Sequence, residues 1–357
     1  MKIQENIPLA PFTTFQVGGP ARYLVEAKNE SDIQDALEFG AERRLPLFVL
    51  GGGSNVVIAD EGWPGLVLKI GLMGIEFSAD GENTLVRAAA GENWDEVVAC
   101  AVERNCAGIE CLSGIPGTVG GTPVQNVGAY GQEVSQTISG VRVLEIATGK
   151  VSELSNEQCG FRYRSSIFNT KESGKYIVLK VAYRLRQGGQ PTVDYADVKK
   201  YFAGFEARPT LQQVRDAVRA IRQSKAMLLV PGDEDCRSAG SFFKNPLVSE
   251  AEADRIEALA RQRAPEKTLP RFRGEGGRVK LAAAWLVEQA GFHRGYARGP
   301  VGISRKHSLA MVNRGGATAR DIVVLKKEIE EKVFDMWGVR LQPEPVFVGF
   351  KQIATGK

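Results

Sequence analysis

A run of three glycines followed by serine and asparagine is the first segment of the sequence whose residue types could bind a ligand. It spans Gly51 to Asn55 and leads into β-branched residues instead of a helix. Adjacent glycines can aim consecutive backbone N–H groups at one point, and without Cβ atoms they admit a phosphate to close range. The segment is therefore a candidate diphosphate cradle, and a glycine-rich turn between two strands is the alternative. It lacks the GxGxxG spacing of a Rossmann fingerprint.

A second glycine-rich segment runs from Gly114 to Glu133 and carries almost no charge until its end. Its glycines, with Thr, Gln, Asn and Tyr between them, offer hydrogen bonds to a flat polar ligand such as a flavin ring. A mobile loop is the alternative interpretation. Bulky residues within the segment, such as Val119 and Val127, favour a segment that packs against the rest of the protein.

Two further residues have side chains in settings that could serve chemistry. Ser241 follows an Ala-Gly pair and precedes two phenylalanines, which would hold its hydroxyl rigidly in a partly apolar setting. Glu344 lies between two prolines beside an apolar run, where burial would raise the pKa of its carboxyl. Each also has an ordinary interpretation: a cap or turn for the serine, an exposed salt bridge for the glutamate. No GxSxG motif surrounds Ser241, so a Ser-His-Asp hydrolase is not supported.

The composition restricts the class of protein. A chain of 357 residues is longer than a single hydrophobic core usually serves, so we expect two or three domains. Hydrophobic and charged contents of 43% and 25% are those of a globular protein and exclude disorder or a fibre. The net charge of +4 does not indicate a nucleic-acid-binding protein. The N-terminal segment has no apolar signal core and no stretch approaches the roughly 20 apolar residues of a membrane helix, so we expect a cytosolic protein.

The cysteine content bears on disulfides and zinc binding, and one basic region bears on the binding of anions. Five cysteines without a CxxC pair, and only two histidines, predict reduced structural thiols and no zinc site. Basic residues outnumber acidic ones between Arg261 and Lys280. That region is either a solvated basic face or a local attractor for an anionic ligand.

Helices and strands alternate irregularly along the chain. Apolar spacing predicts helices over residues 31–44, from about 93, from 210, over 280–290 and over 318–337. Thr210 and Gln213 form a capping box at the start of the third helix, whose buried stripe would contain Leu211, Val214, Val218 and Ile221. Short apolar runs at 45–50 and between 141 and 185 predict strands. This mixture indicates α+β domains.

Six segments together resemble the UDP-N-acetylenolpyruvoylglucosamine reductases of bacterial cell-wall synthesis. In chain order they are TTFQVGGPAR (13–22), LGGGSN, SGIPGTVGGTPVQNVGAYGQE, FRYRSSIF (161–168), SAGSFFKNP and QPEP. They cover nearly the whole chain in the correct order, which is far more specific than any one of them. The resemblance favours the functional interpretation of each segment over its ordinary alternative.

The resemblance implies a fold of class α+β, with a flavin half like that of vanillyl-alcohol-oxidase-like flavoproteins and a separate substrate domain. The expected divisions are FAD-binding subdomains at 1–70 and 71–209, a substrate-binding domain at 210–340, and a C-terminal segment, 341–357, that returns to the flavin half. It also implies non-covalent FAD and NADPH as co-substrate. The reaction would reduce the enolpyruvyl ether of UDP-N-acetylglucosamine to UDP-N-acetylmuramate in peptidoglycan synthesis. We expect a monomer whose partner is this small-molecule substrate, with neither a nucleic acid nor a membrane as partner.

The family's functional positions carry over to this sequence by motif. Arg164, Ser241 and Glu344 match catalytic positions. Tyr195 matches the tyrosine of a loop that closes over the nucleotide in one subgroup, Lys225 and Asn245 match substrate contacts, and His307 matches a position near the bound nucleotide. The expected FAD-binding residues are Gly51, Gly52, Gly53, Ser54, Asn55, Ser113, Gly114, Ile115, Pro116, Gly117, Gly120, Gly121, Gln125, Asn126, Gly128, Ala129 and Tyr130.

Two other functions are considered beside this one. The first is a flavin oxidase of the same fold that acts on an alcohol or sugar. Both histidines, His293 and His307, lie outside the flavin half, which disfavours a histidine-linked flavin and leaves a cysteine link open. The second is a non-catalytic nucleotide-sugar-binding regulator, which the retention of all three catalytic positions disfavours. The acidic run at residues 233–235 aligns with no functional part of the family.

Overall fold

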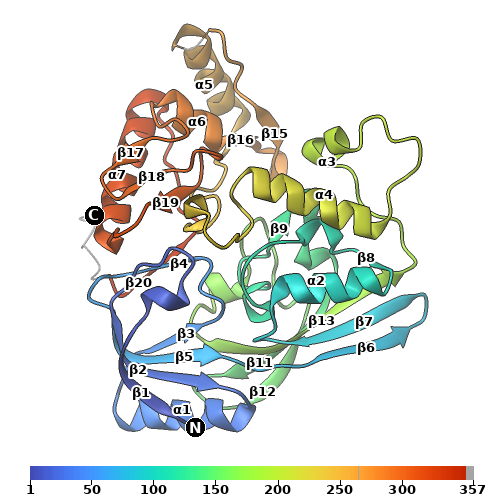
Figure 1. Ribbon diagram of the computed structural model, residues 1–357, viewed down its shortest axis with the longest axis vertical. Coiled ribbons are helices and arrows are strands. Elements are labelled where there is room, and N and C mark those ends of the chain that lie inside the picture. The colour runs from blue at the N-terminus through green and yellow to red at the C-terminus, as the bar shows by residue number, and fades with distance from the viewer. Residues whose placement is uncertain (264, 351–357) are drawn as a thin grey trace. The chain divides into compact units, whose positions relative to one another are not determined.

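Two compact units make up the chain. The computed structural model describes residues 1–263 and 265–350, which are drawn as a ribbon in Figure 1. Unit 1 contains Met1–Ile7, Ala21–Gly53 and Pro64–Leu229; unit 2 contains Pro8–Pro20, Ser54–Trp63 and the described residues from Val230 onward. Both units combine helices with small sheets, which confirms the predicted α+β class.

The first sheet of unit 1 has four strands. Their order is β1 (Ile3–Pro8), β2 (Pro20–Ala27), β5 (Trp63–Ile70) and β3 (Leu47–Leu50). Helix α1 (Glu30–Glu42) begins after Asn29, whose side chain accepts a hydrogen bond from the backbone N–H of Asp32. Such a cap satisfies an N–H group that the first turn leaves unpaired. The helix predicted over 31–44 and the strand after it are confirmed.

The second sheet of unit 1 is larger. It contains β12 (Val151–Ser155), β11 (Ile138–Glu145), β13 (Tyr176–Gln187), β7 (Asn83–Ala89) and β6 (Ile75–Asp80) in that order, and β8 (Cys106–Ala107) also pairs with β13. These strands are antiparallel, and Val181 of β13 lies opposite Val141 on one side and Ala88 on the other. The strands predicted between 141 and 185 are therefore confirmed.

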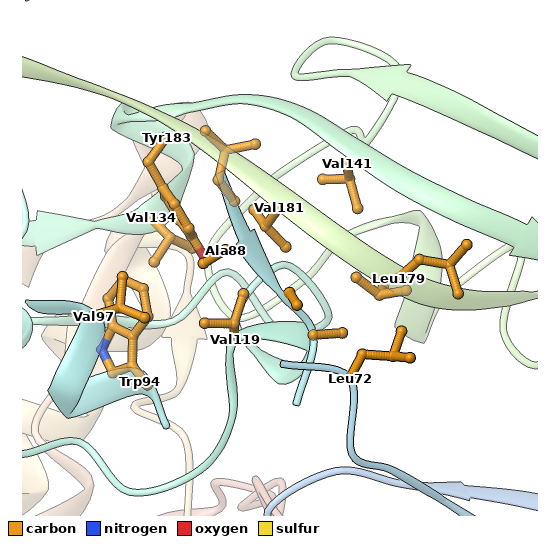
Figure 2. Close-up of a cluster of buried hydrophobic side chains, with 14 of the residues drawn as sticks. Leu72, Ala88, Trp94, Val97, Val119, Val134, Val141, Leu179, Val181 and Tyr183 are labelled. Atoms are coloured by element: carbon orange, nitrogen blue, oxygen red, sulfur yellow. The ribbon is translucent and has the colours of Figure 1, made fainter. Parts of the chain in front are cut away.

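The core of unit 1 forms where helix α2 (Trp94–Glu103) packs against this sheet. Figure 2 shows Trp94 and Val97 of α2 beside Val181 and Tyr183 of β13. Both aromatic rings are buried, yet each polar atom has a partner: the indole N–H of Trp94 donates to the carbonyl of Leu112 at 3.1 Å, and the Tyr183 hydroxyl lies 2.7 Å from that of Thr122. The inward face predicted for this helix is confirmed.

Unit 1 ends with helices α3 (Ala196–Tyr201) and α4 (Leu211–Ser224). The capping box of Thr210 and Gln213 is present at the start of α4. The predicted stripe is buried except for Ile221, which is only partly buried. The expected domain divisions, including the one at 209, stay predictions; the compact unit itself continues through α4 to Leu229.

Unit 2 contains short sheets and, among its described residues, three α-helices. Its strands are β4 (Val56–Ile58) paired with β20 (Val346–Val348); β14 (Leu247–Val248), β16 (Val279–Leu281) and β15 (Arg271–Arg273); and β17 (Ala297–Arg298), β18 (Val301–Ile303) and β19 (Met311–Asn313). Its helices are α5 (Glu250–Arg263), α6 (Ala283–Gln289) and α7 (Ala319–Trp337). Helix α7 is capped by Thr318 and ends at Gly338, which adopts the left-handed conformation with φ of 69°. The helix predicted over 318–337 is confirmed.

The helix predicted over 280–290 begins later than expected. Lys280 belongs to β16, the middle strand of its sheet, where it lies opposite Leu247 and Phe272. The apolar spacing of the local sequence fits a helix, but pairing with two neighbouring strands gives the backbone of Lys280 its hydrogen bonds instead. Helix α6 therefore starts at Ala283, and its C-cap is Ala290, next to Gly291.

The cysteines and the helices bear on two further expectations. All five cysteines lie within the described residues, and none of them forms a disulfide there, consistent with the predicted reduced thiols. Four of them are buried, and Cys100 is partly exposed. Among the described residues, no helix is both long enough and apolar enough to cross a membrane.

Candidate active site

The two glycine-rich segments approach each other closely within unit 1. A Cβ atom on Gly51 would lie 2.9 Å from Oγ1 of Thr118, and one on Gly52 would lie 2.7 Å from Cα of Gly117. Both distances are shorter than real Cβ contacts, so larger residues would push the segments apart. Glycine is thus required where LGGGSN faces SGIPGTVGG. On the open side, a Cβ on Gly121 would meet no atom within 4 Å.

Thr118 has an unusual hydroxyl. Its Oγ1 atom is buried and has no hydrogen-bond partner in the described part of the chain. Leaving such a group unpaired costs about 1–3 kcal/mol, so native proteins rarely do it without a reason. The hydroxyl lies at the contact between the glycine-rich segments, where a polar group of a ligand would complete it. The residues present therefore fit a phosphate-containing cofactor such as FAD.

The second glycine-rich segment packs, as its bulky residues predicted. Val119 is fully buried, and Val127 is partly buried against the same core. The hydroxyl of Ser113 donates to the carbonyl of Glu110 at 2.6 Å, and the amide of Asn126 donates to the carbonyl of Arg162 at 3.1 Å. The mobile-loop alternative is therefore wrong.

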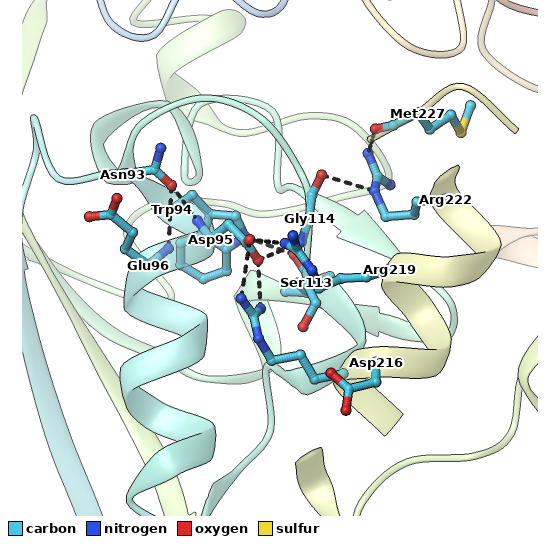
Figure 3. Close-up of polar contacts among 12 residues, drawn as sticks. Asn93, Trp94, Asp95, Glu96, Ser113, Gly114, Asp216, Arg219, Arg222 and Met227 are labelled. Atoms are coloured by element: carbon cyan, nitrogen blue, oxygen red, sulfur yellow. Dashed lines mark hydrogen bonds and ion pairs between the residues drawn. The ribbon is translucent and has the colours of Figure 1, made fainter. Parts of the chain in front are cut away.

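A cluster of charged side chains fixes the first turn of this segment (Figure 3). The carboxylate of Asp95, at the start of α2, accepts a hydrogen bond from the N–H of Gly114 at 2.6 Å. Arg215 donates two hydrogen bonds to the same carboxylate, at 2.6 and 3.1 Å, and Arg219 adds a further ion pair. The buried guanidinium of Arg222 donates to the carbonyl of Gly114 at 3.0 Å. Both polar groups of the Gly114 backbone are thus held by charged side chains.

The electrostatics of this cluster favour the ionised carboxylate. Burial by itself raises the pKa of Asp95, but the hydrogen bonds from Arg215 and Gly114 and the charge of Arg219 outweigh it and hold the pKa below its usual value. Burial also lowers the pKa of Arg222, since desolvation disfavours a charged group. Helix α4 therefore supplies three cations around Gly114, at the start of the second glycine-rich segment.

Three of the expected site residues have strained backbones. Asn126, Tyr130 and Arg164 have φ values of 46°, 49° and 52° although none is glycine. The left-handed region is uncommon for such residues and persists only where the surroundings enforce it, often at functional sites. The guanidinium of Arg164 donates a hydrogen bond of 2.6 Å to the carbonyl of Gly128. This bond connects the FRYRSSIF motif to the second glycine-rich segment.

Tyr195 and Lys225 each contact another side chain of unit 1. The ring of Tyr195, which is 45% exposed, packs edge-on against that of Tyr130 with 5.4 Å between centroids. The ammonium of Lys225 binds the carboxylate of Asp197 at 2.6 Å. Burial lowers the pKa of Lys225, but the bond to Asp197 and nearby acidic groups outweigh it and raise the pKa above its usual value. Lys225 is thus a cation at neutral pH, suited to an anionic ligand.

Ser241 and Glu344 are held side by side in unit 2. Phe243 and Pro343 form an antiparallel bridge, and the N–H of Glu344 donates to the carbonyl of Phe242 at 2.8 Å. Phe242 and Phe243 are buried, which anchors the backbone at the bridge and next to the serine, as the sequence predicted. Glu344 is only partly buried, so its expected raised pKa stays a prediction.

Asn55 connects the first glycine-rich segment to the glutamate. Its amide donates to the carbonyl of Glu344 at 3.3 Å, and its own carbonyl accepts from the N–H of Val346 at 2.9 Å. These bonds continue into the parallel pair of β4 and β20. The hydroxyl of Ser241 lies 3.3 Å from Nε2 of His307, so unit 2 brings together four of the expected site residues.

Comparison with known proteins gives consistent matches along the chain. A profile described as "UDP-N-acetylenolpyruvoylglucosamine reductase, C-terminal domain" matches residues 231–348, and one described as "FAD binding domain" matches residues 21–155. The UDP-N-acetylenolpyruvoylglucosamine reductase of Thermobifida fusca is 43% identical over 96% of this chain and 97% of its own. The protein of the same name from Streptomyces avermitilis is 44% identical over 96% of this chain and 94% of its own.

The chain belongs to the UDP-N-acetylenolpyruvoylglucosamine reductase family. A crystal structure of the reductase from Thermus caldophilus has the same fold, with a TM-score of 0.66 and 24% identity over 98% of this chain and 99% of that one. The resemblance stated from the six segments is confirmed. These matches establish the family, whereas the role of each individual residue stays a prediction.

The two units divide the residues expected to function in this reductase family. Arg164, Tyr195 and Lys225 lie in unit 1, together with the expected FAD-binding residues other than Ser54 and Asn55. Unit 2 contains those two residues and Ser241, Asn245, His307 and Glu344. Asn245 has a structural partner: its amide oxygen accepts from the N–H of Ala283 at 2.9 Å and caps α6.

Sequence reasoning missed two features of the site. Thr118 lies inside the glycine-rich segment, but its hydroxyl is notable only because it lacks a partner, which no sequence pattern reveals. The arginines at 215, 219 and 222 did leave a signal. Their spacing places three cations on one face of an otherwise apolar-striped helix, and such a face predicts an acidic partner. That partner, Asp95, lies far away in the sequence.

Proposed function

We propose that this protein reduces the enolpyruvyl ether of UDP-N-acetylglucosamine to UDP-N-acetylmuramate, with FAD as cofactor and NADPH as co-substrate, in peptidoglycan synthesis. The observation that carries the proposal is identity of 43% over nearly the whole length of a relative named for this reaction. The pairing of the serine and glutamate segments in unit 2 supports it, because it gives the reaction a proton donor and a carboxyl group on adjacent backbone.

Gly51, Gly52 and Thr118 are the residues that would hold FAD in unit 1, together with the backbone of the second glycine-rich segment. The glycines leave room for the ligand, and the threonine offers its unpaired hydroxyl. When bound, FAD would take electrons from NADPH and supply hydride to the methylene carbon of the enolpyruvyl group. The residues of this chain then have to manage the charge that the substrate gains.

Negative charge on the substrate spreads over the neighbouring carbon and its carboxylate. Arg164 holds that carboxylate through its planar guanidinium and stabilises the charge. Glu344, if protonated or linked through water, adds a hydrogen bond to the same group. Ser241 transfers its proton to the carbon. Serine is a weak acid, so the transfer requires a strongly basic carbon and a hydroxyl held in place.

Tyr195 and Lys225 belong to the substrate side in this proposal. Tyr195 is nearly half exposed at the start of α3, and Lys225 is a cation at the end of α4. An exposed ring can close over a uridine ring, and an ammonium can bind a phosphate. A location in the cytosol and a monomeric state remain parts of the proposal.

The test is to purify the protein, record its visible spectrum and follow NADPH oxidation with and without the enolpyruvyl substrate. We expect a flavin spectrum and NADPH oxidation that depends on the substrate, with one NADPH consumed for each UDP-N-acetylmuramate formed. The flavin-oxidase alternative predicts oxidation of an alcohol or sugar with oxygen and no reaction with the enolpyruvyl substrate. The names of the relatives favour the reductase.

A further inference from the structure

The loop that carries His307 is attached directly to the segment that carries Ser241. This loop joins β18 and β19 in unit 2. Nε2 of His307 lies 3.3 Å from Oγ of Ser241, and the N–H of Phe242 donates to the carbonyl of Leu309 at 2.8 Å. One contact is made by side chains and the other by backbones, so the imidazole has a fixed place beside the serine hydroxyl.

The acidic run that the sequence left without a role holds the other side of this loop. Asp235 is buried, and its carboxylate accepts from the backbone N–H of Arg305 at 3.2 Å and from its Nε at 3.4 Å. Asp233 binds the ammonium of Lys306 at 2.5 Å, and this hydrogen bond holds the pKa of Asp233 below its usual value. Both residues immediately before His307 are therefore anchored by carboxylates.

We propose that His307 is a positioning residue for Ser241, and that Asp233 and Asp235 hold its loop in place through Arg305 and Lys306. The inference deepens the proposed function and rests on it, since it assumes that Ser241 is the proton donor. It assigns a role to an imidazole expected only near the nucleotide and to an acidic run with no assigned role.

The direction of the hydrogen bond follows from the reaction. If Nε2 of His307 accepted the serine proton, that proton would point away from the substrate. If Nε2 donates its own N–H to Oγ, the O–H of Ser241 is free to point at the substrate carbon. We therefore assign the proton of the imidazole to Nε2 and the acceptor role to Oγ.

The same hydrogen bond stabilises the serine during the transfer. The O–H bond of Ser241 breaks while a C–H bond forms at the substrate carbon, whose electron pair takes up the proton. The electron pair of the broken bond stays on Oγ, which becomes an anion until water restores its proton. A donor already aimed at Oγ strengthens as this charge develops, which is how oxyanion-stabilising donors accelerate reactions.

The first test compares His307→Ala with His307→Gln in the FAD-loaded enzyme. In this test the enzyme is first reduced by NADPH and then mixed with saturating enolpyruvyl substrate, which reoxidises it. We expect His307→Ala to slow this reoxidation about 10- to 100-fold. The affinity for UDP, measured by calorimetry, and the rate of reduction by NADPH should stay within about twofold. His307→Gln keeps an N–H donor and should recover part of the loss.

A contact with the nucleotide alone would give the opposite pattern. The affinity for UDP would fall, while the rate at saturating substrate would equal that of the parent, and this result would overturn the proposal. Failure of the proposed function is distinguishable, because the parent protein would then not oxidise NADPH in response to the substrate at all.

The second test uses no turnover and decides whether the contact exists in solution. The chain has two histidines, so a protein labelled with ¹⁵N-histidine gives few side-chain signals, and His293→Gln assigns them. Ser241→Ala should shift the nitrogen signals of His307 and leave those of His293, which is exposed, unchanged. Signals of His307 that do not respond to Ser241→Ala would overturn the proposal.

The third test addresses the acidic run with a matched pair of variants. Asp235→Asn should slow the same step about 3- to 10-fold, because it weakens two hydrogen bonds to Arg305. Glu234→Gln is the control. Glu234 is half exposed and its carboxylate lies 3.7 Å from the guanidinium of Arg305, and such exposed ion pairs contribute little to stability. Equal rates for both variants and the parent would remove the acidic run from the proposal.

Discussion

Ser241 is the residue on which the proposed reaction depends, because it would supply the proton that the substrate carbon receives. Reduction of the enzyme by NADPH needs no proton transfer to a substrate carbon. Ser241→Ala should therefore keep that rate within about tenfold of the parent. Reaction of the reduced enzyme with the enolpyruvyl substrate should fall by about 10²- to 10⁴-fold, the usual effect of a positioned general acid.

Stopped-flow absorbance separates the two half-reactions of Ser241→Ala. Equal slowing of both would point to damaged folding or cofactor binding instead of a lost proton donor. An unchanged rate with the enolpyruvyl substrate would remove Ser241 from the mechanism.

Thr118 gives a second prediction at the scale of a single residue, and its two effects have opposite signs. Thr118→Val removes a buried hydroxyl that has no partner in the described structure, so the FAD-free protein should be as stable as the parent or more stable. If that hydroxyl binds FAD, the affinity for FAD should fall about 5- to 10-fold. Thermal unfolding of the FAD-free proteins and FAD titration measure the two effects.

Thr122→Val is the matched control for Thr118→Val. The hydroxyl of Thr122 lies 2.7 Å from that of Tyr183 and donates to the carbonyl of Val119 at 2.8 Å. Its removal leaves a buried partner unpaired and should lower stability by about 1–3 kcal/mol. A loss of stability in Thr118→Val as large as in Thr122→Val would show that the hydroxyl of Thr118 serves the fold and not a ligand.

At the scale of elements, the contact between α2 and α4 stabilises the turn at Gly114. Asp95→Asn keeps the shape of the side chain but removes the charge that binds Arg215 and Arg219. We expect the free energy of unfolding to fall by about 2 kcal/mol at pH 7, because two partly buried cations lose their counterion. Urea unfolding measures this, with Asp216→Asn, on the exposed face of α4, as a control within about 0.5 kcal/mol of the parent.

The effect of Asp95→Asn should depend on pH in one direction. The pKa of Asp95 is lower in the folded protein than its ordinary value of 3.8. Its carboxylate therefore adds stability above pH 3.8, and this contribution is lost as the pH falls through the folded pKa. The difference between parent and variant should be complete at pH 5 and above and shrink below pH 3.8. A difference that is the same at all pH values would mean that the charge of Asp95 is not what stabilises the contact.

The elements predictable from the sequence are those whose signals are local. The capping box of Thr210 and Gln213 needs only its own turn, and the structure contains it. Lys280 shows the limit: its strand depends on pairing with Leu247 and Phe272, and the local spacing instead suggested a helix. The glycine-rich segments were recognisable by composition, but their contact depends on two parts of the chain that lie far apart in the sequence.

The same limit applies to the candidate site. Six motifs in order were enough to state the family, because they are short and local. The contact of Ser241 with His307, and the anchoring of the His307 loop by Asp233 and Asp235, depend on residues separated by about seventy positions. Such contacts follow only from the folded chain.

For the molecule as a whole, the chemistry of the cysteines decides how FAD can be attached. A covalent link through cysteine requires a reactive thiolate. Burial raises the pKa of Cys159 to about 12 and also raises that of Cys111 well above its usual value. These thiols stay protonated at neutral pH and are inert. Cys100 is the partly exposed cysteine of the five, all of which lie in the described chain.

FAD should therefore be held by non-covalent contacts alone. We expect the purified protein to be yellow, and acid or heat to release all of the flavin, because four of the five described cysteines are buried and neither histidine lies in unit 1. Absorbance of the supernatant after acid precipitation measures the released FAD, and the intact mass of the denatured chain should equal that calculated from the sequence. Colour that stays with the denatured chain would contradict this expectation, and loss of that colour in Cys100→Ser would identify the attachment point.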